Sequence, residues 1–257
     1  MISSYDPVAP SFGRNRALPD QVPEAIRTGI LQAVHTPSPR ILDLGAGSGR
    51  IGWAFVDAGD DYVGVDLSPG MLRAFAARAG HGDHVRPRLI QADGQQLPFA
   101  DAAFDIVMLM QVFGGLYRWR QLLREARRVV RRGGALVLGR ALMPAAGLDA
   151  QMKQRLAVIL AEMEARDERS NTREQAETFL AKETSDKRRI IAAQWHTGRT
   201  PRAFLDRHRT GARFSRLPEA VKEESLGRLA AWAAQTFGSL DEAISEQHQF
   251  ELLVYRF

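Results

Sequence analysis

The chain has 257 residues, of which 45% are hydrophobic and 25% charged, so it can bury the core of one large domain or of a domain with an insertion. It contains no cysteine, which excludes disulfide bonds, thiolate metal sites and cysteine nucleophiles. The formal net charge of +5 is compatible with an acidic partner such as RNA. Arginines that solvate helix faces give the same charge balance, and a nucleic-acid partner is therefore disfavoured.

No apolar run approaches the length that crosses a bilayer, and residues 1–6 lack the basic and then apolar start of a signal peptide. We therefore expect a cytoplasmic protein without a membrane partner. The oligomeric state stays open between monomer and homodimer.

The first part of the chain reads as an arm followed by a helix. Residues 1–20 are rich in proline, serine, glycine and arginine, which predicts an arm or short helix laid over a site. The spacing of Val22, Ile26 and Ile30 then predicts a helix over residues 21–34.

Apolar runs that end in acids then alternate with helical spacing. This alternation predicts a doubly wound parallel sheet, an α/β fold whose ligands bind beyond the carboxyl ends of the strands. Ser68 and Pro69 supply an N-cap and a first-turn proline for one of the helices. The predicted strands are 41–43, 62–66, 88–93, 104–110 and 135–139.

The second half of the chain changes to mainly helical spacing. The apolar stripe from Leu148 to Met163 predicts a long helix, and Thr172–Gln175 fits the capping box of another. Two further helices and strands at 189–195 and 250–257 follow. We therefore predict a core with an N-terminal arm over residues 1–142, a helical lid insertion over 143–188, and the remainder of the core with its final helices and terminal strand over 189–257.

Two nucleotide-binding patterns overlap at the end of the first strand. Gly47, Gly49 and Gly52 satisfy G-x-G-x-x-G, while the residues from Asp43 onward satisfy D-x-G-x-G-x-G. A carboxylate at this strand end suits a cationic group better than a pyrophosphate. Asp93, which ends the third strand, is placed to accept from the exocyclic amine of an adenine ring. These features favour a cofactor with a cationic group and an adenine ring over a nicotinamide dinucleotide, and a dehydrogenase is a distant alternative.

Four segments, 41–49, 63–71, 91–107 and 129–138, together resemble the class I S-adenosylmethionine-dependent methyltransferases. Residues 5–9 and 95–99 narrow the resemblance toward the branch that includes ubiquinone and menaquinone biosynthesis enzymes and many small-molecule methyltransferases. The resemblance implies a Rossmann-like, mostly parallel seven-stranded sheet with an antiparallel last strand and an inserted helical lid. It also implies a cofactor, S-adenosyl-L-methionine, with S-adenosyl-L-homocysteine as its product.

The resemblance also implies roles for particular residues. Asp43 and the backbone at Gly45 and Gly47 would lie against the methionine part of the cofactor, and Asp66 would hold the ribose diol. Leu67 and Met71 would pack on the adenine, whose amine Asp93 would bind. The rest of the implied cofactor set is Ala46, Ala92, Gly94, Gln111, which would face the methyl group or the acceptor, and Arg16, a candidate for the cofactor carboxylate.

The acceptor and the catalytic base are less defined. The sulfonium methyl group is already electrophilic, so in-line alignment, exclusion of water and removal of a proton suffice. Among three candidate histidines, His196 ranks first because it follows a predicted strand next to the lid. His208 is expected to be solvated and His248 to be structural. Gln111 is the second catalytic candidate, and no metal site is expected.

A small, largely apolar molecule under the helical lid is the favoured acceptor, because Met152 and Met163 could line an adaptable pocket. Core packing explains the same methionines equally well. Transfer to O, N or C stays open. Two alternatives also remain, namely an RNA or protein methyltransferase that uses the basic surface and a cofactor-binding module without methyl transfer.

Overall fold

The computed structural model describes residues 18–79, 86–113, 118–165, 171–209 and 217–257. The chain divides into two compact units. The first, here called the sheet unit, comprises the chain up to residue 141 together with residues 171–193 and 250–257. The second, here called the helical unit, comprises residues 142–170 and 194–249.

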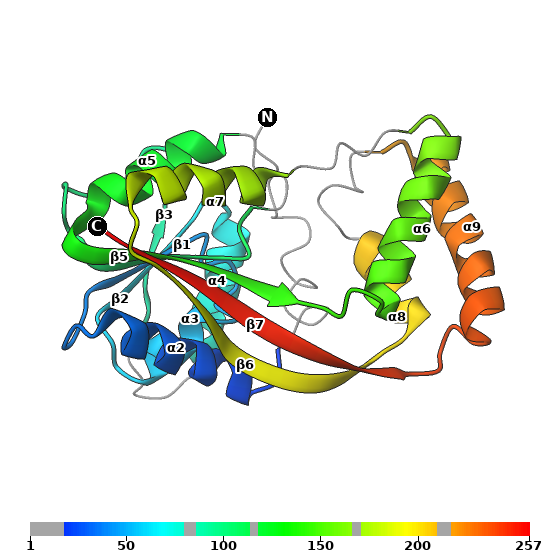
Figure 1. The fold of residues 1–257 in the computed structure, drawn as a ribbon, viewed down its shortest axis with the longest axis horizontal. Helices are drawn as coiled ribbons and strands as arrows, with labels where there is room; N and C mark the ends of the chain where they lie inside the picture. The colour runs from blue at the N-terminus through cyan, green and yellow to red at the C-terminus, as the bar shows by residue number, and fades with distance from the viewer. Residues whose placement is uncertain (1–17, 80–85, 114–117, 166–170, 210–216) are drawn as a thin grey trace. The chain divides into compact units, whose positions relative to one another are not determined.

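Seven strands of the described chain form one sheet in the order β3-β2-β1-β4-β5-β7-β6 (Figure 1). Neighbours from β3 through to β5 pair in parallel. The last strand runs antiparallel to β5, since the Gly133 N–H donates to the Phe257 carbonyl and the Phe257 N–H donates to the Gly134 carbonyl. The predicted fold class, including its antiparallel last strand, is therefore confirmed. The strands are β1 (Ile41–Leu44), β2 (Tyr62–Asp66), β3 (Arg88–Gln91), β4 (Phe104–Met110), β5 (Val130–Leu142), β6 (Lys187–Arg199) and β7 (Ile244–Arg256).

Helices cover both faces of this sheet in the sheet unit (Figure 1). The helix predicted over residues 21–34 is α2 (Gln21–Val34), which lies on the same face as α3 (Gly52–Asp57). The opposite face carries α5 (Trp119–Val129) and α7 (Thr172–Glu183). The helix after β2 is α4 (Pro69–Ala76), which continues into a short 3-10 turn, η2 (Ala77–Ala79).

Strand β4 is buried along its whole length, as a central parallel strand covered on both faces requires. Leu109 and its neighbours pack against the apolar stripe of α5, in which Leu123 and Ala126 have no exposed surface. The helical spacing of α5 thus places one face on the sheet and leaves its arginines on the other.

The helical unit has its own core. Its helices are α6 (Leu148–Glu162), α8 (Pro201–Arg209) and α9 (Glu219–Phe237). Met152 has no exposed surface and packs with Phe204 and Leu229, while Met163 is partly buried against the same core. Core packing, rather than the lining of a pocket, is therefore the observed role of Met152.

The observed units divide the chain differently from the predicted insertion at 143–188. Helix α7 belongs to the sheet unit, because Ala176 and Leu180 are buried in the sheet core and Phe179 packs edge-on against Trp119. Helices α8 and α9 join α6 instead. Apolar spacing identifies each helix but not the surface that it packs against, which depends on contacts far along the chain.

No helix in the described ranges combines the length and the apolar character needed to cross a bilayer.

Replacing Gly49 by alanine should destabilise the fold more than the same change at Gly59. Both glycines have positive φ, +72° and +77°, which costs an L-residue about 1 kcal/mol. A Cβ at Gly49 would also lie 2.2 Å from the Phe75 ring, whereas nothing lies within 4 Å of one at Gly59. Urea unfolding should show an additional loss of about 1–3 kcal/mol for Gly49→Ala. Equal losses would contradict the close approach.

Candidate cofactor site

The turn after β1 depends on glycine. Gly45, Gly47 and Gly49 have φ of +86°, +56° and +72°, a region that L-residues rarely adopt. A Cβ on Gly45 would lie 2.8 Å from Val112, but the space around Gly47 is open. Helix α3 begins only at Gly52, so no helix N-terminus follows the turn directly, as pyrophosphate binding would require. The turn therefore leaves space for a ligand beside the half-buried backbone of Gly47.

Asp66 joins this turn to the end of β2. One carboxylate oxygen accepts from the Gly47 N–H at 2.8 Å, and the other accepts from the Ser68 N–H at 2.8 Å. Ser68 is in turn the N-cap of α4, since its hydroxyl accepts from the Met71 N–H at 3.2 Å. Asp66 is half-buried at the carboxyl edge of the sheet.

Asp43 has a different environment from the one expected of it. Its side chain is 2% exposed in the core below the turn, and one of its oxygens accepts from the Tyr62 hydroxyl at 2.7 Å. The other oxygen has no hydrogen-bond partner among the described residues. Burial raises the pKa of Asp43 to about 7, against the hydrogen bond from Tyr62, while the nearby Asp66 charge raises it further. The sequence pattern identified this acid but not Tyr62, its partner.

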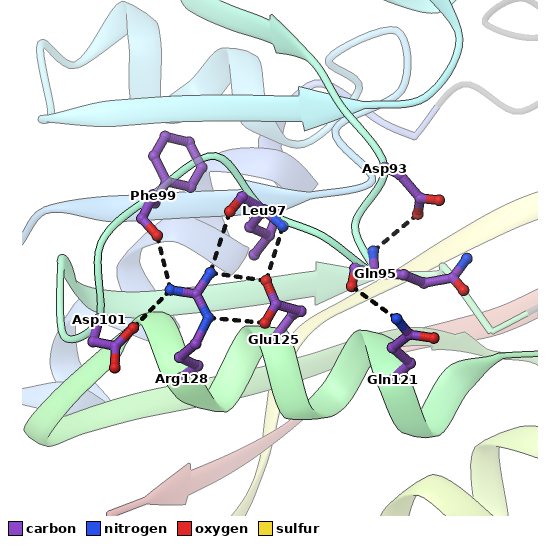
Figure 2. Close-up of polar contacts among 8 residues, drawn as sticks. All are labelled: Asp93, Gln95, Leu97, Phe99, Asp101, Gln121, Glu125 and Arg128. Carbon is purple, nitrogen blue, oxygen red and sulfur yellow. Dashed lines mark hydrogen bonds and ion pairs between the residues drawn. The ribbon is translucent and has the colours of Figure 1, made fainter.

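Asp93 begins a loop that is held in place by hydrogen bonds. Its carboxylate accepts from the Gln95 N–H at 2.9 Å, and its carbonyl accepts from the Gln96 N–H at 2.9 Å. Further along, the Leu97 N–H donates to Glu125 at 2.9 Å. Figure 2 shows this loop beside α5, with Gln121 also bound to the Gln95 carbonyl at 3.3 Å.

Arg128 binds the later part of this loop, a contact that the sequence analysis did not predict. Its guanidinium donates to the carbonyls of Phe99 at 2.8 Å and Leu97 at 3.2 Å, and to both oxygens of Glu125 at 2.8 Å (Figure 2). It also donates to Asp101 at 2.8 Å. The hydrogen bonds from Arg128 lower the pKa of Glu125. The sequence does contain one indication of this pair: Glu125 and Arg128 are three residues apart on one helix, a spacing at which oppositely charged side chains form ion pairs.

Gln111 lies beside the glycine turn, where it binds Arg50. It follows β4 with φ of +60°, its N–H donates to the Gly139 carbonyl at 2.9 Å, and its side-chain oxygen accepts from Arg50 at 2.7 Å. The two residues expected to contact the adenine differ in exposure. Leu67 is 39% exposed, whereas Met71 is buried in the core.

The remaining residues of the predicted cofactor set hold the loops together. The Ala92 N–H donates to the Asp66 carbonyl at 3.2 Å, which ties the ends of β2 and β3. Gly94 has no room for a side chain, since a Cβ would lie 2.5 Å from Leu122. Ala46 is nearly buried, and its N–H donates to the Val65 carbonyl at 3.0 Å.

The candidate base His196 lies on β6 in the helical unit, with its side chain exposed. His248 is buried, with Nε2 3.2 Å from a Glu246 oxygen, in accord with the structural role expected of it. The expectation that His208 is solvated is wrong. Its ring stacks on Phe204, and burial lowers its pKa to about 4. The candidate Arg16 lies outside the described residues.

A family model described as a methyltransferase domain matches residues 42–138. The matched residues all lie in the sheet unit. The demethylmenaquinone methyltransferase of Corynebacterium urealyticum is 39% identical over 102 residues, which cover 40% of this chain and 41% of that protein. The demethylmenaquinone methyltransferase of Renibacterium salmoninarum is 33% identical over 147 residues, which cover 56% of this chain and 59% of that protein. The chain thus spans about two to three fifths of these curated relatives.

Solved structures share the fold of the methyltransferase domain at low sequence identity. The YcgJ protein of Bacillus subtilis has a TM-score of 0.57 and 19% identity, and the match covers 90% of this chain and 97% of that chain. A candidate type II methyltransferase from Anaeromyxobacter dehalogenans has a TM-score of 0.61 and 17% identity, with coverage of 93% and 98%.

The buried Asp43 should make the stability of the methyltransferase domain depend on pH. Because its folded pKa of about 7 exceeds its ordinary value of 3.8, the folded state holds the proton more tightly, and its contribution to stability falls as pH rises through this window. Asp43→Asn should remove this loss. Urea unfolding from pH 4 to pH 8 should show the variant gaining up to about 4 kcal/mol relative to wild type. The exposed Asp57→Asn should show no such gain, and a pH-independent difference for Asp43→Asn would contradict the assignment.

Removing the guanidinium of Arg128 should loosen the loop that begins at Asp93. Hydrogen exchange of the amides in residues 93–101 should accelerate by about tenfold or more in Arg128→Ala, because the carbonyls of Leu97 and Phe99 lose a charged donor. Arg124→Ala, an exposed change on the same helix, is the matched control. Equal exchange in the two variants would show that Arg128 does not hold the loop.

Proposed function

We propose that the chain transfers a methyl group from S-adenosylmethionine to a small, largely apolar molecule. The observation that carries this proposal is the arrangement around Asp66. At the carboxyl edge of the sheet its carboxylate binds the Gly47 N–H, beside which there is space for a ligand, and the next residue in the chain, Leu67, is exposed. A nucleoside needs these groups together, namely an acceptor for its hydroxyls and an apolar surface for its base.

The residues at this edge fit the cofactor. Asp66 would accept from the ribose hydroxyls, Leu67 would pack against the adenine, and the carboxylate oxygen of Asp93 that does not bind Gln95 would accept from the adenine amine. The open backbone at Gly47 would lie against the methionine part. Asp43 lies buried beneath the turn, and a cationic ligand bound above it would favour the ionised form of its carboxyl group.

When bound, S-adenosylmethionine supplies an electrophilic methyl group, so the chain has to align the acceptor, exclude water and receive a proton where the acceptor loses one. Gln111 is our candidate for orienting the acceptor, because Arg50 fixes its side-chain oxygen beside the glycine turn. His196 is our candidate for the proton acceptor. Its side chain is accessible to solvent.

The names of the relatives support a small apolar acceptor. Two of them are demethylmenaquinone methyltransferases. An acceptor of that general kind, an aromatic or quinone-like molecule methylated on carbon or oxygen, is our proposal for this chain. The alternatives are an RNA or protein acceptor and a binding module without transfer.

Asp66→Asn should weaken binding of S-adenosylhomocysteine by about tenfold to a hundredfold, since an amide replaces a charged acceptor for the ribose hydroxyls. Isothermal titration of wild type and variant measures the change, with Asp57→Asn as an exposed control on α3. Incubation with methyl-labelled S-adenosylmethionine and demethylated quinones should then give labelled product with wild type only.

Two outcomes would contradict this proposal. If the folded wild type does not bind S-adenosylhomocysteine, S-adenosylmethionine is not its cofactor. Binding without transfer to any quinone or other small aromatic acceptor, together with label on RNA or protein, would replace the acceptor class. Urea unfolding of Asp66→Asn separates lost affinity from lost folding, because Asp66 also holds the Gly47 N–H.

A further inference from the structure

Basic side chains from three elements of the helical unit gather around one buried acid. Asp149, in the first turn of α6, is 1% exposed, and one of its oxygens accepts from Arg207 of α8 at 2.6 Å. Lys153 follows Asp149 by four residues on the same side of α6. Arg199 ends β6, and electrostatic interactions link it to both Arg207 and Asp149. We call Lys153, Arg199 and Arg207 the basic cluster.

Glu246, the other acid near the basic cluster, is bound to neighbouring groups of the fold. One oxygen of Glu246 accepts from the Leu148 N–H at the start of α6, and the other lies 3.2 Å from Nε2 of His248. Gly147 packs directly on this carboxylate, since a Cβ there would lie 2.7 Å from it. Glu246 is therefore a cap for α6 rather than an available partner for the arginines.

Two members of the basic cluster have no carboxylate of their own. Neither Lys153 nor Arg199 forms an ion pair or a hydrogen bond within the part of the chain that the structure describes. The Nε–H of Arg199 is buried without an acceptor, which is costly for a charged group. Desolvation lowers the pKa values of both groups, and repulsion by Arg207 lowers them further, against the attraction of Asp149, which raises them.

The charge balance indicates what would bind. Three cations lie near the carboxylate of Asp149, and Arg199 also interacts electrostatically with the charge of Glu246, while the neighbouring His208 is neutral at pH 7 because its pKa is about 4. One positive charge remains in excess. A carboxylate neutralises this excess, whereas a phosphate dianion would reverse it. Lys153 is exposed, so a ligand can reach this member of the basic cluster from solvent.

We propose that the helical unit binds a small-molecule carboxylate through Lys153, Arg199 and Arg207. The carboxylate accepts from the Nε–H of Arg199 and the ammonium of Lys153, which relieves the repulsion between these cations. The site lies within one unit and does not depend on methyl transfer. The carboxylate belongs either to the methyl acceptor or to a separate ligand, because the recognition chemistry is the same.

Benzoate and its neutral analogue benzamide are the probes. Isothermal titration of the full chain at constant ionic strength should show benzoate binding and no benzamide binding. Lys153→Gln and Arg199→Gln should each weaken benzoate binding by about tenfold or more, since each removes a charged donor. Lys182→Gln, an exposed change on α7, should leave it unchanged. Benzoate should also protect Lys153 from acetylation by acetic anhydride, measured by peptide mass spectrometry.

Circular dichroism establishes whether each variant folds. If Arg199→Gln does not fold, the exposed variant Lys153→Gln provides the test. The proposal is overturned by equal binding of benzoate and benzamide, by benzoate binding of wild-type strength in Lys153→Gln, or by inorganic phosphate binding more tightly than benzoate. A benzoate affinity that changes with bound S-adenosylhomocysteine supports the site and assigns it to the acceptor. An unchanged affinity supports the site and assigns it to a separate ligand. Benzoate binding is measured without methyl transfer, so a chain that transfers no methyl group can still confirm this site.

Discussion

The close approach of Gly52 to Tyr62 sets the geometry of the cofactor edge. A Cβ on Gly52 would lie 2.1 Å from the Tyr62 hydroxyl, so only glycine lets α3 settle onto β2 at this point. The same hydroxyl donates to the buried Asp43, and the Tyr62 ring packs against Phe55 and Phe75. One contact between a backbone and a ring thus connects the helix after the glycine turn, the acid below it and the core behind it.

The three acids at the strand ends perform three different tasks. Asp43 is sealed in the core, where its proton affinity is high. Asp66 uses both oxygens to join two backbone segments and remains partly accessible. Asp93 starts a loop whose shape depends on a helix below it. Equivalent positions at parallel strand ends therefore do not have equivalent chemistry, because burial and neighbours decide the charge state of each acid.

The local sequence pattern was sufficient to predict the order of strands and helices, since apolar runs that end in acids alternate with segments whose apolar residues recur every 3.6 residues. It also placed Gln111 directly after the fourth strand, at the edge where the parallel strands end. It could not show that Tyr62 satisfies Asp43, since this pair forms only when two strands lie side by side. The role of Arg128 and the docking of α7 on the sheet were missed for the same reason, as both depend on partners about 30 or more residues away.

Strand β7 lies between β5 and β6 in the sheet although it follows both of them in the chain. During synthesis, the five parallel strands can therefore assemble while β5 still has an open edge. Strand β6 has no place in the sheet until residues 244–256 have left the ribosome. The nascent chain thus carries β5 with one open edge through the translation of about a hundred residues. The molecule is most exposed to misassembly in that interval, and the insertion of one late strand ends it.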